Sequence, residues 1–96
     1  MGNFEIKSSN LQSTYSYKND DVNVTGGFRL NTVDNAFVSN DGNITDKQGR
    51  FVANFNGSMN PDGKTIYNIS GITADNSEMV WGAINDIEAN ILGKNQ

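Results

Sequence analysis

The chain of 96 residues contains no cysteine and no histidine. Without cysteine it can form neither a disulfide nor a thiolate metal site. Without histidine it cannot build a Ser-His-Asp triad, and acid–base chemistry would have to come from other side chains. These two absences remove the side chains most often used in catalysis and metal binding. We therefore expect a protein that is not an enzyme and that holds no metal and no cofactor.

Basic and long apolar segments are also missing. Lysine and arginine together number 7 against 11 aspartates and glutamates, which leaves a net charge of −4. The basic residues are scattered, whereas nucleic-acid-binding domains show a basic stripe. No apolar run approaches the ~20 residues of a membrane-spanning helix, and the first residues do not resemble a signal peptide. We expect a cytoplasmic protein of a bacterium or phage that binds neither nucleic acid nor membrane, with secretion after signal-peptide removal left open.

The carboxylates that are present stand where turns and helix caps need them, and they form no catalytic pair. The stretch Asn40-Asp41-Gly42-Asn43 offers oxygen ligands, but it lacks the spacing and the closing glutamate of a calcium loop. Gly26-Gly27 precedes no predicted helix, so it does not indicate a phosphate-binding loop. Neither motif predicts a ligand.

The single proline lies in Asn60-Pro61-Asp62-Gly63, which has the residue order of a type I turn closed by a glycine bulge. This turn predicts a hairpin register, because Asn60 must then face Lys64. The expected pairs are Met59–Thr65, Gly57–Tyr67, Phe55–Ile69 and Ala53–Gly71 on one face, which Phe51 ends, and Asn54–Ser70 and Asn56–Asn68 on the reverse face. A rival turn at Asn56-Gly57 would leave the proline turn unused.

Alternation of apolar and polar residues predicts further strands in the first half of the chain. Phe4 and Ile6 form a short strand, and a bend follows at residues 8–10. A turn at Asn19-Asp20 predicts the pairs Tyr17–Val22, Tyr15–Val24, Ser13–Gly26 and Leu11–Phe28, with Leu30 extending that face. In the weaker segment 31–50 we expect a hairpin at Asp41-Gly42 and a turn at residues 47–49.

The last part of the chain has the pattern of an amphipathic helix over roughly residues 76–92. Asp75 and Glu78 have the spacing of a capping box, and Gly93 suits the position after the last turn. An apolar stripe at 3.6-residue spacing predicts the buried face of the helix. Its members are Val80, Ala83, Ile84, Ile87 and Ile91. Asn85, Asp86 and Ala89 lie on the far side.

Together these elements predict one α+β domain over residues 1–96. Its meander of about five to seven antiparallel strands spans residues 3–73, and the single C-terminal helix packs on one face of the sheet. A helix about 10 Å across covers only two or three strands spaced ~4.8 Å apart. Either the sheet curls into a half-barrel around the helix, or a second copy covers the remaining apolar face.

Two functions follow from that apolar face. The first is a non-enzymatic interaction module that acts as a homodimer or through contact with another protein. The alternative is a curled sheet that holds a small molecule such as a lipid or a sugar between its aromatic residues and the helix. The candidate interface or ligand face consists of Tyr15, Tyr17, Phe28, Tyr67, Trp81 and Leu92. Trp81, beside Leu92 and Glu88 on the helical wheel, either covers the edge of the core or anchors a partner.

Overall fold

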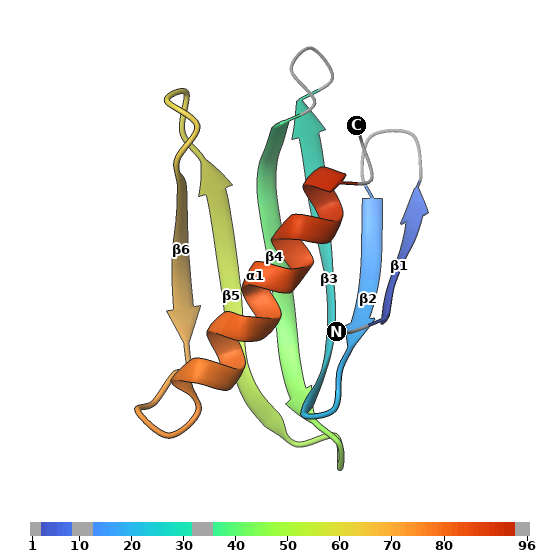
Figure 1. Ribbon diagram of the computed structural model, residues 1–96, viewed down its shortest axis with the longest axis vertical. Coiled ribbons are helices and arrows are strands. Elements are labelled where there is room, and N and C mark those ends of the chain that lie inside the picture. The colour runs from blue at the N-terminus through green and yellow to red at the C-terminus, as the bar shows by residue number, and fades with distance from the viewer. Residues whose placement is uncertain (1–2, 9–12, 32–35, 94–96) are drawn as a thin grey trace.

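The computed structural model describes residues 3–8, 13–31 and 36–93, and it confirms the predicted meander with one C-terminal helix (Figure 1). The elements are β1 (Asn3–Ser8), β2 (Ser13–Lys18), β3 (Val22–Asn31), β4 (Ala36–Asp46), β5 (Phe51–Met59), β6 (Thr65–Ser70) and α1 (Ser77–Gly93). The strands follow one another in the sheet in chain order, and each is antiparallel to the next. The sheet stays open, with β1 and β6 as its two edges.

The β5–β6 hairpin has the predicted turn and register. Within the turn, the Asn60 N–H donates to the Lys64 carbonyl at 2.8 Å, and the Gly63 N–H donates to the Asn60 carbonyl at 2.9 Å. Gly63 has a φ of 87°, a conformation that favours glycine. Gly57 faces Tyr67 as predicted, and a Cβ on Gly57 would lie 2.2 Å from a ring carbon of Tyr67. Gly57 therefore makes room for the aromatic ring across the strands.

The turn between β2 and β3 lies one residue later than predicted, with Asp20 and Asp21 at its tip. The Asn19 side-chain oxygen accepts the N–H groups of Asp21 and Val22 at 2.8 and 2.9 Å. The Asn19 N–H donates to the Val22 carbonyl at 3.1 Å. Asparagine thus acts as the residue that opens the turn, and not as one of its two central residues.

This displacement moves every strand partner by two residues. Tyr17 pairs with Val24 instead of Val22, and Ser13 pairs with Phe28 instead of Gly26. Because side chains alternate between faces with a period of two, the predicted inward set is unchanged. Leu11 and most of the bend predicted at residues 8–10 lie outside the described residues.

The hairpin predicted at Asp41-Gly42 is wrong, because β4 runs without interruption through both residues. Gly42 faces the core opposite Gly26 and Phe55, and a Cβ there would lie 2.5 Å from the Phe55 ring. The glycine therefore serves close packing and not a turn. The next predicted turn is confirmed, since the Gly49 N–H donates to the Asp46 carbonyl at 3.0 Å.

The sequence predicts that Phe51 ends the inward face of β5, and this prediction is wrong. The pairing shifts between Ile44 and Thr45, so that Ile44 opposes Ala53 while Thr45 opposes Phe51. The extra residue, Val52, packs against the core, whereas Phe51 is 58% exposed. A bulge of this kind reorients the residues at the end of a strand, and alternation alone does not reveal it.

Helix α1 buries the predicted stripe completely: Val80, Ala83, Ile84, Ile87 and Ile91 are each 0% exposed. The helix begins after Asn76, whose carbonyl accepts the Val80 N–H at 2.9 Å, so the predicted cap at Asp75 lies one residue too early. Gly93 is the last helical residue and not the one that follows it. Among the residues that the structure describes, no helix is long and apolar enough to cross a membrane.

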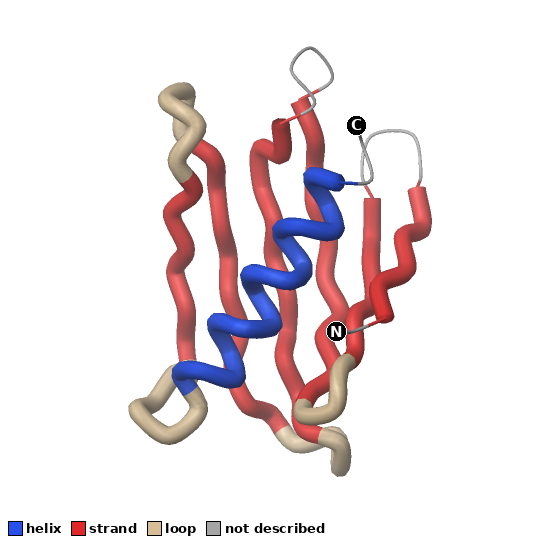
Figure 2. The backbone as a smooth tube through the Cα atoms, viewed as in Figure 1, coloured by secondary structure: helices blue, strands red, loops and turns tan. Residues whose placement is uncertain are grey.

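One helix covers more of the sheet than its diameter predicts. Figure 2 shows α1 crossing the strands obliquely, from the β5–β6 side toward the upper part of β3. Its stripe belongs to one buried cluster together with inward residues of four strands. Those strand residues are Tyr15, Tyr17, Val22, Val24, Phe28, Phe37, Ile44, Ala53 and Phe55, each 5% exposed or less.

Candidate functional site

Half of the predicted interface or ligand face belongs to the core. Tyr15, Tyr17 and Phe28 are 4%, 3% and 5% exposed, and the Tyr15 ring contacts the rings of Phe4 and Phe28 at 5.3 and 6.2 Å. They pack in the same apolar cluster as the helical stripe, in the space where a small ligand was expected. The remaining predicted residues lie nearer the surface: Tyr67 and Leu92 are partly buried against the core, and Trp81 is 38% exposed.

A chain of hydrogen bonds crosses the inner face of the sheet beneath the helix. The Tyr15 hydroxyl directs its single hydrogen to the Asp41 carbonyl at 2.6 Å, and the Asn40 side-chain oxygen lies 3.1 Å from the same hydroxyl. The Asn40 amide donates to the Tyr67 hydroxyl at 3.3 Å, and that hydroxyl donates to Glu88 Oε2 at 3.0 Å. Among the described residues, no buried side-chain nitrogen or oxygen lacks a partner.

The two tyrosine hydroxyls of this network do not ionise at neutral pH. Burial raises the pKa of the Tyr15 and Tyr67 hydroxyls well above 10.0, so both stay protonated. Sequence reasoning missed its members Asn40 and Glu88. The signal for Asn40 is its alternation with Gly42 and Ile44, which becomes visible only when β4 is read as one strand.

Tyr17 makes the free energy of unfolding depend on pH in the alkaline range. Its hydroxyl donates to Asp86 Oδ2 at 2.7 Å and accepts the Asn19 amide at 3.1 Å. Burial, followed by the bond to Asp86, raises the pKa of Tyr17 from 10.0 to about 12. Because the folded-state pKa lies above the unfolded value, this contribution is complete below pH 10 and is lost as the pH rises through about 12.

We expect the free energy of unfolding of the Tyr17→Phe variant to fall less steeply between pH 10 and 12 than that of the wild type. Phenylalanine keeps the buried ring and removes the group that ionises. Urea unfolding followed by circular dichroism, at a series of pH values up to about 12, measures both curves. Parallel curves would contradict the assignment.

The exposed large hydrophobic residues within the described segments gather at one side of the molecule. They are Phe51, Ile66 and Trp81, which are 58%, 54% and 38% exposed. Phe51 reaches Gly71 at the end of β6, since a Cβ on Gly71 would lie 3.0 Å from the Phe51 ring. The Trp81 ring meets the Tyr67 ring edge to face at 5.9 Å. All three residues therefore lie on, or directly beside, the edge strand β6.

The two edges of the sheet differ in charge. Strand β1 contains Glu5 and Lys7, whereas β6, with the sequence TIYNIS, has no charged residue. Charged side chains, proline and bulges are the usual means of keeping an edge strand from pairing with another chain. Strand β6 has none of them, and its pairing with β5 runs without a register shift. By this criterion β6 is the less protected of the two edges.

The hairpin bonds show which backbone groups of β6 point outward. Because Asn60 donates to the Lys64 carbonyl, Lys64 directs that carbonyl toward β5, while its N–H donates to Asp62 Oδ1 within the turn. In an antiparallel pair this direction alternates along the strand, so Ile66 and Asn68 also bond to β5. Thr65, Tyr67 and Ile69 turn their N–H and C=O groups toward the free edge, which amounts to three donors and three acceptors.

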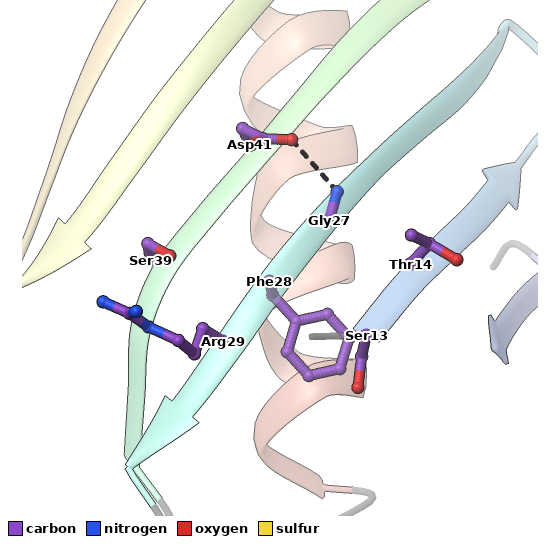
Figure 3. Close-up of a pocket in the computed structure, with 7 residues that line it drawn as sticks. All are labelled: Ser13, Thr14, Gly27, Phe28, Arg29, Ser39 and Asp41. Atoms are coloured by element: carbon purple, nitrogen blue, oxygen red, sulfur yellow. Dashed lines mark hydrogen bonds between the residues drawn. The ribbon is translucent and has the colours of Figure 1, made fainter. Parts of the chain in front are cut away.

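The outer face of the sheet holds a shallow hollow of about 300 Å³ between β2, β3 and β4 (Figure 3). Gly27 forms its floor, and the Gly27 N–H donates to Asp41 Oδ1 at 3.0 Å. Arg29 and Ser39 lie at one side of the hollow, while the Phe28 ring belongs to the core. The hollow is open to water and combines an acid with a base, so its charges select no particular ligand.

A second hollow, between the first turns of α1 and the β2–β3 turn, is lined by three carboxylates. These are Asp21, Asp75 and Glu78, but the described residues contain no group of three or more acidic side chains placed to hold a metal ion.

Comparison with known proteins adds no assignment: no family model, no curated protein and no solved structure matches the chain. The β6 edge, with the exposed Ile66 and Trp81 beside it, is the candidate functional site.

Proposed function

We propose that the protein is a non-enzymatic interaction module that binds a β-strand of a protein partner along the edge of β6. The observation that carries the proposal is the uncharged edge itself, with Thr65, Tyr67 and Ile69 turning unpaired backbone groups outward. The missing histidine and cysteine support the non-enzymatic part of the proposal. Strand addition of this kind derives its affinity from main-chain hydrogen bonds and its specificity from the flanking side chains.

Apolar side chains beside β6 add binding free energy to that of the backbone hydrogen bonds. Each new hydrogen bond is worth only about 0.5–1.5 kcal/mol net, because the free groups already bond to water. Ile66 on the outer face and Trp81 beside the inner face are already partly dehydrated and can lose further apolar surface to a partner. Tryptophan is among the residues that most often dominate binding energy at interfaces.

A peptide with the sequence of residues 64–71 of this chain (KTIYNISG) tests whether the edge accepts a strand. We expect it to slow hydrogen exchange at the amides of Thr65, Tyr67 and Ile69 in dilute, isotope-labelled protein, measured by NMR. The amides of Ile66 and Asn68 already bond to β5 and serve as internal references. Unchanged exchange at the three outward amides would contradict the proposal.

Ile66→Lys is expected to reduce binding of this peptide at least tenfold. A lysine on an edge strand must lose its hydration or repel the approaching strand, which is how natural edges are protected. Ile66→Thr is the matched control, because threonine keeps the β-branched shape and adds no charge. Since Ile66 is 54% exposed, both variants should keep the stability of the wild type within about 0.5 kcal/mol. Equal binding by both variants would show that the peptide binds elsewhere.

A further inference from the structure

We infer that the partner strand is β6 of a second copy of this chain, paired antiparallel so that Tyr67 faces Tyr67 across a two-fold axis. The inference rests on the proposed function, because it names the occupant of the same edge. It follows from the symmetry of β6. Thr65, Tyr67 and Ile69 are the residues whose backbone groups point outward, and Tyr67 is the middle one.

Only the register centred on Tyr67 satisfies every outward group of both strands. In that register Thr65 faces Ile69 of the second copy, Tyr67 faces its own counterpart, and Ile69 faces Thr65. Each of these three facing pairs exchanges two hydrogen bonds, which makes six. A shift by two residues in either direction leaves two facing pairs and four bonds, so an N–H and a C=O on each copy stay unpaired.

The side chains agree with the same register. On the inner face each Tyr67 ring lies over Gly57 and reaches Asn40 of its own chain, so the two rings would point away from each other. On the outer face Ile66 would lie opposite Asn68, and both are exposed in the single chain. Lys64, the charged residue that precedes the strand, would lie opposite Ser70. Within the paired strands no like charges face each other, and the helical carboxylate beside them, Glu88, bonds to Thr65 and Tyr67 of its own chain.

The pairing would extend the sheet to two copies of six strands, with both helices on the same face. The contact is limited to one short strand and a few side chains from each copy. We expect it to bury less surface than the ~1,200 Å² of a stable interface. We therefore expect a dimer that forms reversibly and dissociates on dilution. Light scattering on a size-exclusion column should show its mass fall toward that of the monomer as the loaded concentration is lowered.

Because the chain has no cysteine, single cysteine substitutions report the register directly. Ile66 and Asn68 would face each other as a non-hydrogen-bonded pair with Cα atoms about 4.5 Å apart, which is within reach of a disulfide. We expect a mixture of the Ile66→Cys and Asn68→Cys variants, treated with a mild oxidant, to form a covalent dimer at least tenfold faster than either variant alone. Asn54→Cys, exposed on the same face but one strand inward, is the control and should not cross-link.

The other outcomes overturn the inference in different ways. Fastest cross-linking of Ile66→Cys alone or of Asn68→Cys alone would place that residue on the two-fold axis and contradict the register. If no combination cross-links faster than Asn54→Cys, a second copy is not the partner. The peptide titration is read separately, on dilute protein. Slowed exchange there, without cross-linking, would keep the edge as a binding site for another protein, whereas failure of both experiments would reject the proposed function.

Discussion

Replacement of Ile87 by aspartate is expected to unfold the protein. Ile87 is 0% exposed and lies in the middle of the only described helix, facing the sheet. The substitution removes about 1.5–3 kcal/mol of apolar burial. It also places a carboxylate where nothing has been arranged to pair with it, at a cost of several kcal/mol more. The sum approaches the whole stability of a typical domain, about 5–15 kcal/mol.

Circular dichroism and the dispersion of amide NMR signals measure this effect. Ala89→Asp is the matched control, since it introduces the same residue into the same helix at an exposed position. We expect the control to keep the native spectrum and to lose less than about 1 kcal/mol. A folded Ile87→Asp variant with a stability close to that of the control would show that the helix does not seal the core as described.

Gly26→Ala is expected to destabilise the protein by about 1–3 kcal/mol or more, although it adds a single methyl group. A Cβ on Gly26 would lie 1.9 Å from the backbone carbonyl oxygen of Asp41, and that oxygen accepts the Tyr15 hydroxyl. Backbone atoms cannot rotate away as the end of a side chain can. The β3–β4 pair would therefore have to separate where Gly26 faces Gly42.

The neighbouring glycine provides the control for this prediction. A Cβ on Gly27 would have the Ser13 carbonyl as its closest neighbour, at 3.3 Å, so that a small adjustment accommodates it. Urea unfolding of Gly26→Ala and Gly27→Ala should show a large loss for the first variant and a change of about 0.5 kcal/mol or less for the second. Similar values for both would mean that the loss reflects strand propensity and not the close approach of β3 and β4.

Contacts close in the chain made some parts of this protein predictable. The conformation of the turn Asn60–Gly63 is determined by its own residues, because proline fixes φ and glycine permits a positive φ whatever the distant residues are. With that turn given, the pairing of Gly57 with Tyr67 follows by counting. The helical stripe is equally local, since its spacing of 3.6 residues identifies Ile84 and Ile87 as buried before the sheet beneath them is known.

Residues whose role depends on distant partners misled the sequence reading. Gly42 has the same neighbours as a turn glycine, and only the Phe55 ring on the next strand explains why it lies inside β4. The bulge that exposes Phe51 comes from pairing with Thr45, which no pattern within β5 reveals. In both cases contacts between strands, and not the neighbouring residues in the chain, determine where the residue lies.

The candidate site differs from the predicted one for the same reason. The sequence alone identified Tyr67 and Trp81 as candidates, together with aromatic residues that a narrow helix could not cover. The packing of the assembled core decided the outcome: Tyr15 and Phe28 are buried in it, whereas Trp81 stays 38% exposed beside Tyr67 of β6. Alternation and turns determine which face a side chain takes and where a strand ends. Which strand remains an uncovered edge is a property of the assembled sheet, because it depends on where every other strand finds its partner.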